Sequence, residues 1–161
     1  MLAGLFRFVC HNGLVCGDTF ADIRVPHKGN VAGQVIEGAY EVLKGFEQVQ
    51  EARDSMRAIT LEAGEDEVFA RSALALKYDD PNKPAPVTES QLLVPRRWDD
   101  RKSDLWSTFN RIQENLVKGG LTGRAANGRR QRTRPVQGID QNLRLNRALW
   151  MLAEGMRQLK A

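Results

Sequence analysis

The chain has 161 residues, of which 42% are hydrophobic and two are cysteines, and its formal net charge is +4. This length predicts a single domain able to bury its own core, and two cysteines are too few for a disulfide scaffold. No apolar run approaches the ~20 residues of a membrane span, and the apolar start is too short for a secretory signal, so we expect a cytoplasmic protein without a membrane partner.

The first 28 residues are predicted to form short antiparallel strands. Apolar residues 5–9 lead into the pair Asn12-Gly13, which favours a type I′ hairpin turn, and the return strand would start at Val15. A third short strand is expected over residues 20–25. Because two or three short strands are not stable alone, they need a helix or further strands packed against them.

Residues 29–78 are predicted to form an acidic helical region. Apolar residues recur at helical spacing over residues 31–49, and a second helix is expected over about residues 65–78, with acidic residues in its first turn. The pattern leaves open whether residues 52–59 continue the first helix. The proline-rich connector, residues 79–87, separates this acidic region from a basic one.

The basic region, residues 88–161, is predicted to hold the remaining helices. A capping box at Thr88 starts a short helix, a second helix ends near residue 118, and a third covers about residues 141–160. Leucines spaced four and three residues apart in this closing helix predict a packing seam, either within the domain or between copies in a homo-oligomer. The expected fold class is α+β, with an N-terminal antiparallel hairpin followed by four to five helices.

Charge is distributed unevenly along the chain. Residues 1–95 carry nine Lys or Arg and fourteen Asp or Glu, whereas residues 96–134 carry eleven and four. Clustered charge steers association with a partner of opposite sign over about a Debye length, ~8 Å at physiological salt. The basic region is therefore expected to meet an anionic partner, and nucleic acid is the first candidate.

The strongest basic signal is residues 118–134, which hold six basic residues, five Gly or Asn residues and no acidic residue. We expect a surface loop here, because such a segment cannot form a core. Arginine binds phosphate through paired hydrogen bonds, and a tryptophan in the preceding basic block could stack on an unpaired base. The candidate binding residues are Arg96, Arg97, Trp98, Arg101, Lys102, Lys118, Arg124, Arg129, Arg130, Arg132 and Arg134.

Each of these signals also has a structural explanation. The arginine-rich loop could be a solvated segment, and Trp98 and Trp106 could be core residues. Amide side chains on two of the helices, such as Gln113 and Asn146, could tie those helices together instead of binding a ligand.

Catalytic and metal-binding patterns are weak. Four residues near the N-terminus could ligate zinc, although their spacing matches no common zinc module: Cys10, His11, Cys16 and His27. Three acidic residues could hold magnesium in a nuclease-like site, but they also suit balancing nearby arginines and starting a helix: Asp99, Asp100 and Asp104. No Walker loop, nucleophile elbow or dinucleotide-binding turn is present. We therefore expect a non-enzymatic protein with no catalytic residue, cofactor or metal.

Several motifs together resemble a known family. The chain is similar to the phage/plasmid-like family of unknown function, encoded on prophages and conjugative elements, in VCHNGL, RRWDDR, DLWSTFNRIQENL, the GG followed by NGRR and TRPV, and LNRALWMLAEGM. The resemblance runs over nearly the whole chain, and in that family these motifs form the C-terminal half of a longer protein. It implies a mobile-element setting and no established reaction.

Two hypotheses follow. The first is a non-enzymatic accessory protein of a phage or plasmid that binds single-stranded DNA or RNA through the arginine-rich loop. The second is an anti-defence, anti-CRISPR-like inhibitor that binds a host nucleoprotein complex.

Overall fold

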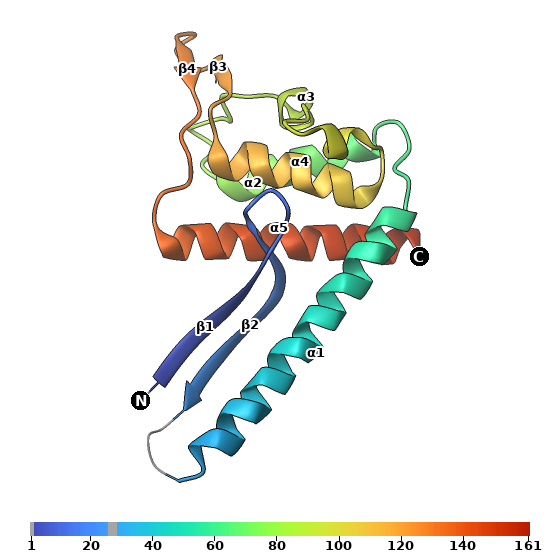
Figure 1. Ribbon diagram of the computed structural model, residues 1–161. Coiled ribbons are helices and arrows are strands. Elements are labelled where there is room, and N and C mark those ends of the chain that lie inside the picture. Colours follow the sequence, from blue (N-terminus) through green and yellow to red (C-terminus); the bar gives the residue numbers. More distant parts are fainter. Residues whose placement is uncertain (1, 26–28) are drawn as a thin grey trace.

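The computed structural model describes residues 2–25 and 29–161. A body of packed helices carries one small hairpin at its edge, while a longer hairpin and a long helix extend away from it (Figure 1). In chain order the elements are β1 (Leu2–Val9), β2 (Val15–Val25), α1 (Val31–Ala58), α2 (Glu65–Lys77), α3 (Glu89–Leu92), the 3-10 turn η1 (Trp98–Arg101), α4 (Leu105–Lys118), β3 (Thr122–Arg124), β4 (Arg130–Arg132) and α5 (Ile139–Lys160). The α+β class is confirmed.

The β1–β2 hairpin differs from the prediction in two respects. Residues 15–25 form one continuous strand, so the expected third strand is wrong; the pairing instead shifts register between Phe6 and Phe8. The type I′ turn is also wrong, because only Gly13, with φ of 79°, has a positive φ among the five residues between β1 and β2. The amide of Gly13 donates to the carbonyl of Cys10 at 2.9 Å, as in a type I turn followed by a left-handed glycine.

Helix α1 is continuous from Val31 to Ala58, so residues 52–58 do extend the predicted helix. The Asn30 side chain accepts the Gly33 amide hydrogen at 3.0 Å and caps its start. Only the last turns reach the core, where Met56 is fully buried. Val35, Ile36, Tyr40 and Leu43 are each at least half exposed. The first half of α1 therefore presents apolar side chains at the surface beside β2 (Figure 1).

The core is built around α4. All its residues from Leu105 to Val117 are buried, and it contacts α1, α2, α3, α5 and η1. Trp106, Phe109 and Trp150 pack edge to face or tilted, with ring centroids 5.7 to 6.4 Å apart. Trp106 is thus a core residue.

The buried amides of α4 have structural partners. Gln113 Nε2 donates to Asn146 Oδ1 and to the carbonyl of Val15, both at 2.7 Å. Asn115 Nδ2 donates to the carbonyls of Leu92 and Val94, both at 2.8 Å. These bonds tie α4 to α5, β2 and the segment after α3, so the structural explanation of the amides is the correct one.

Other predicted features are also present. The capping box of Thr88 and Gln91 starts α3. In α5, Leu145 and Leu149 are buried in the core and Leu152 packs against it, so this part of the leucine seam lies within the domain, whereas Leu159 is exposed. Across the described parts of the chain, no helix is long and apolar enough to cross a membrane.

Candidate nucleic-acid interface

The arginine-rich segment is a β-hairpin, so its prediction as a loop is wrong. Strands β3 and β4 pair antiparallel, with Thr122 opposite Arg132, Gly123 opposite Gln131 and Arg124 opposite Arg130. The signal that identifies this hairpin is the pair Asn127-Gly128, because Gly128 takes a φ of 78° in the turn. The Asn127 side chain accepts the Arg129 amide hydrogen at 3.1 Å and stabilises the turn.

Backbone hydrogen bonds anchor the root of the hairpin. The Gly120 amide donates to the carbonyl of Thr133 at 2.8 Å, and the Thr133 amide donates to the carbonyl of Leu121 at 2.8 Å. The buried Thr133 hydroxyl accepts the Leu121 amide hydrogen at 2.9 Å. The hairpin therefore projects from a fixed base at the end of α4 (Figure 1).

The proline-rich connector packs closely against β3. The Arg124 amide donates to the carbonyl of Pro86 at 2.9 Å. A Cβ atom on Gly123 would lie 1.7 Å from the Pro86 oxygen, so position 123 has room only for glycine. This contact fixes one face of the hairpin against the connector.

Strand alternation places the arginines on the opposite face. Directly paired residues of an antiparallel ladder project to the same side, so Arg124, Arg130 and Arg132 share one face, whereas Gln131 lies on the other with Gly123. We call Arg124, Arg130 and Arg132 the arginine face. Arg124 and Arg130 lie directly opposite each other, an arrangement of like charges that is unfavourable.

The hairpin arginines have few partners of their own. Within residues 2–25 and 29–161, no ion pair joins the arginine face or Arg129 to a carboxylate. Arg124 Nη1 donates to the carbonyl of Gly128 at 3.4 Å, and Arg132 Nε donates to that of Gly120 at 3.3 Å. Both bonds are long and exposed, so these guanidinium groups are available to an anion.

Two hollows adjoin the hairpin. One, of about 670 Å³, is lined by Arg130 and Arg132 of the arginine face and by Lys118. The other, of about 1040 Å³, lies between the hairpin, the connector, the end of α2 and the start of α5. The two share lining residues: Gln131, Thr133, Arg134 and Pro135. They are therefore contiguous along β4, with Arg134 between them.

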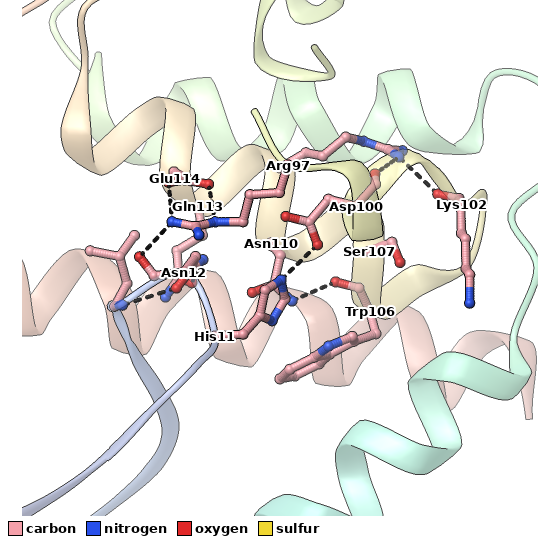
Figure 2. A network of polar contacts seen from close by, with 12 residues as sticks. His11, Asn12, Arg97, Asp100, Lys102, Trp106, Ser107, Asn110, Gln113 and Glu114 are labelled. Atoms are coloured by element: carbon pink, nitrogen blue, oxygen red, sulfur yellow. Dashed lines mark hydrogen bonds and ion pairs between the residues drawn. The ribbon is translucent and has the colours of Figure 1, made fainter. Parts of the chain in front are cut away.

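Arg97 and Lys118, which the sequence suggested as ligand contacts, are engaged within the fold. Glu114 Oε1 lies 2.9 Å from Arg97 Nη2 and 2.8 Å from Lys118 Nζ, and its side chain is 5% exposed. Lys118 Nζ also donates to the carbonyl of Asn12 at 2.7 Å. Figure 2 shows Arg97 and Glu114 beside Asn12 at the tip of the first hairpin.

Burial raises the pKa of Glu114, but hydrogen bonds from Arg97 and Lys118 outweigh this effect and hold the pKa below its usual value. Arg96 is also engaged, since its Nε donates to Asn115 Oδ1 at 2.7 Å and its Nη2 donates to the carbonyl of Gly119. These three cations hold the first hairpin and the root of the second to α4.

The remaining predicted residues lie apart from the arginine face. Trp98 is 76% exposed, with the guanidinium carbon of Arg101 4.2 Å from its ring centroid. Lys102 lines a separate cavity of about 650 Å³ together with His11 and Arg57. Trp98, Arg101 and Lys102 thus do not line either of the two hollows that adjoin the second hairpin.

The acidic residues considered for magnesium have separate structural roles. Asp104 Oδ1 accepts the Ser107 amide hydrogen at 2.9 Å and caps α4. Asp100 is buried, with its Oδ1 2.8 Å from His11 Nε2 (Figure 2). In the described part of the chain, no group of three or more His, Cys, Asp or Glu is placed to hold a metal ion, and His27 lies outside that part.

Sequence reasoning missed several residues of the larger hollow. Lys77 and Tyr78 come from the end of α2, Gln141 and Arg144 come from the start of α5, and Gln131 comes from β4. No local pattern links them, because they come from three segments that only the fold brings together.

Comparison with known proteins relates the chain to a family. The family model for "Domain of unknown function (DUF932)" matches residues 1–150. Two proteins of Escherichia coli (strain K12) are each 56% identical to it: the UPF0380 protein YafZ over 156 residues, 97% of this chain, and the UPF0380 protein YfjQ over 154 residues, 96% of this chain. No solved structure matches.

The chain covers 56% of the length of each of these relatives. The expected membership of a family of unknown function is thus confirmed. Its phage or plasmid setting and its correspondence to a C-terminal half stay predictions.

Proposed function

Because this chain belongs to the DUF932 family, whose description assigns no function, we propose a function from the geometry of the β3–β4 hairpin: it binds single-stranded nucleic acid without catalysing a reaction. The observation that carries the proposal is the arginine face, three guanidinium groups on one side of an anchored ribbon without carboxylate partners in the described residues. The proposed setting is an accessory role in a phage or plasmid.

Guanidinium chemistry supports phosphate as the partner. Arginine is always charged at physiological pH and presents planar donors that match two phosphate oxygens at once. The like-charge pair of Arg124 and Arg130 is unfavourable in the free protein, and a bound phosphate between the two side chains would relieve the repulsion. The fixed root would reduce the entropy lost when these side chains become ordered.

Single strands are favoured over duplex DNA. A two-stranded ribbon can enter the major groove of a duplex. Here, however, the connector covers the face of β3 opposite the arginines, so the hairpin has only one open face. The adjoining hollow of about 1040 Å³ has room for a nucleobase, which a duplex keeps stacked inside the double helix. The test is to add an unlabelled duplex of the same sequence to the protein bound to a labelled single strand. If single strands are preferred, the duplex should not displace the labelled strand.

Salt dependence of binding tests the proposal. Fluorescence anisotropy of a labelled 12-mer single strand would be measured at several salt concentrations. Contacts with about four to six phosphates predict a slope of log affinity against log salt between about −3 and −4. Replacing the three residues of the arginine face, Arg124, Arg130 and Arg132, with Ala should reduce the magnitude of this slope by about 2.

A charge-matched control separates local contacts from overall charge. The variant carrying Lys44→Ala, Arg53→Ala and Arg57→Ala also removes three positive charges, but from α1. We expect it to keep nearly the wild-type slope. Absence of binding at low salt, or equal loss of slope in both triple variants, would reject the proposal.

A second candidate function is inhibition of a host nucleoprotein complex by protein binding. The observation that favours it is the exposed apolar side chains in the first half of α1, including Ile36 and Leu43, because clustered exposed apolar groups are typical of protein-binding surfaces. The test is a stoichiometric complex that survives nuclease treatment. It should be lost in the variant Ile36→Asp/Leu43→Asp and kept when the hairpin arginines are replaced.

A further inference from the structure

The larger hollow beside the hairpin differs chemically from the arginine face. Its walls combine amide side chains, an aromatic ring and proline rings. Asp79 is the one acidic residue among its lining residues, whereas four cations also line it: Lys77, Lys83, Arg134 and Arg144. At about 1040 Å³ it is as large as the sites that bind small molecules, so it can hold a nucleotide.

The position of Gln131 follows from strand alternation. Since Arg130 and Arg132 project to the arginine face, Gln131 between them projects to the other face and lines the larger hollow, although it also borders the smaller one. Its partner across the ladder is Gly123, which is covered by the Pro86 carbonyl, and Pro86 also lines the larger hollow. Gln141, from the first turn of α5, lines the same hollow.

Both glutamines are exposed, and neither has a side-chain hydrogen bond to another described residue. An amide carries donors and an acceptor side by side, so Gln131 and Gln141 can pair with the edge of a nucleobase.

Tyr78 gives the hollow an aromatic wall. Its ring is half-buried at the end of α2, and Lys77 Nζ lies 5.5 Å from the ring centroid. Burial raises the pKa of Tyr78, so the phenol stays neutral at physiological pH. Lys77 Nζ donates to the carbonyls of Leu116 at 2.8 Å and Arg134 at 3.1 Å, which fixes this wall to α4 and to the end of the hairpin.

The two hollows meet at Arg134, which lines both. A strand whose phosphates lie on the arginine face would therefore pass a cation at the entrance of the larger hollow. We infer that this hollow receives an unpaired nucleobase of the bound strand, stacked on Tyr78 and read at its edge by Gln131 and Gln141. This inference rests on the proposed function and identifies its ligand as a strand with at least one unstacked base.

Base preference tests the inference separately from phosphate binding. The affinities of dT, dA, dC and dG 12-mers would be measured by anisotropy at one salt concentration. We expect the wild-type protein to prefer one base, and the variant Gln131→Ala/Gln141→Ala to lose most of that preference while its salt slope is unchanged. The control is Gln158→Ala, an exposed glutamine elsewhere on α5, which should leave both properties unchanged.

Replacement of the aromatic wall gives a second measurement. Tyr78→Leu removes stacking but keeps apolar volume, and we expect it to weaken binding of the preferred strand about 5- to 100-fold. Tyr40→Leu, on the exposed part of α1, is the matched control and should have no effect. Thermal unfolding checks that each variant folds; the double glutamine variant alters only exposed side chains, so it decides the matter if Tyr78→Leu is unstable.

The outcomes distinguish the two proposals. Salt-dependent binding with no base preference, or with a preference unchanged in the variants, would overturn the nucleobase site and leave phosphate binding standing. Absence of single-strand binding by the wild-type protein would overturn both. Loss of preference with an unchanged salt slope would support both.

Discussion

The two hairpins of this chain have connections of equal length, five residues each, but opposite surroundings. In each, an asparagine side chain accepts the amide hydrogen two residues ahead: Asn12 from Leu14 at 2.9 Å, and Asn127 from Arg129 at 3.1 Å. Asn12 is 1% exposed and donates to Gln113 Oε1 at 3.0 Å, whereas Asn127 lies at the surface. The same local turn therefore forms the tip of the β1–β2 hairpin, which is buried in the core, and the tip of the β3–β4 hairpin, which projects from the core.

The cations near the two tips also differ, because those near the first tip have a carboxylate partner and those near the second have none in the described part of the chain. Arg97 and Lys118 beside the first tip share the carboxylate of Glu114 and donate to the Asn12 carbonyl. Arg129 and Arg130 at the second tip have no carboxylate partner among the residues that the structure describes. A basic residue close to a buried acid contributes to folding, whereas one without such a partner remains available for an external anion.

The largest effect is expected at the carboxylate of the first tip. Glu114→Gln should lower the free energy of unfolding by about 2–3 kcal/mol, because Arg97 and Lys118 lose their carboxylate partner. This loss is smaller than that expected on breaking a fully buried ion pair, because both cations are partly exposed. Urea denaturation measures it. Glu154→Gln, which removes a surface ion pair with Arg157, should change stability by about 0–1 kcal/mol. Equal losses would show that Glu114 does not hold the first tip.

Replacing the two asparagines compares the tips directly. Asn12→Ala should lower the free energy of unfolding by about 1–3 kcal/mol, since Gln113 loses a buried partner. Asn127→Ala should change it by no more than about 0.5 kcal/mol, because the side chain is exposed. Chemical denaturation of the pair gives the comparison, and similar values for both variants would contradict the structural role of the first tip.

Adding a methyl group at Gly123 tests how the second hairpin is anchored. Gly123→Ala should reduce stability by about 1–3 kcal/mol and weaken single-strand binding, because the new Cβ would press against the Pro86 carbonyl. At Gly155, in α5, a Cβ would meet no atom within 4 Å, so Gly155→Ala should raise the melting temperature instead. Unchanged stability and binding in Gly123→Ala would show that the connector does not fix the hairpin.

The smallest expected effect is a pH dependence of stability. The pKa of Glu114 is lowered in the folded protein, so its contribution is fully present above the unfolded value of about 4.3 and is lost as pH falls through the lower folded pKa. Glu114→Gln should therefore lose less stability than the wild-type protein on acidification below about pH 4. Denaturation midpoints measured between neutral and acidic pH provide the check, and parallel curves would assign acid sensitivity to other groups.

Much of the fold follows from local sequence patterns. Apolar spacing locates α1, α2, α4 and α5, and the capping box at Thr88 locates α3, because helix periodicity and caps act within a few residues. An Asn-Gly pair lies in the turn of each hairpin. The second pair was not used to predict a hairpin, because the surrounding arginines indicated a solvated loop. The sequence did not predict that β2 is continuous. Residues 17–20 resemble a turn, but in the structure they lie at the register shift between β1 and β2 and remain part of the strand.

The candidate site was only partly predictable. Composition identifies the arginines of residues 118–134, since charge density is a local property. The engagement of Arg97 depends on Glu114, seventeen residues away, and on the carbonyl of Asn12, 85 residues away. Tyr78 and Gln141 belong to the larger hollow only because α2 and α5 end beside the hairpin. Such contacts depend on tertiary packing, which no window of sequence contains.

Photocrosslinking tests the central claim most directly. A 12-mer single strand carrying 5-bromouracil would be irradiated with the protein, which is then cleaved after Asp and Glu. This cleavage isolates the first tip in residues 1–18, the second hairpin in residues 115–140 and Tyr78 in residues 68–79. We predict adducts on residues 115–140 and on residues 68–79. Adducts concentrated on residues 1–18, or none on residues 115–140, would contradict the account.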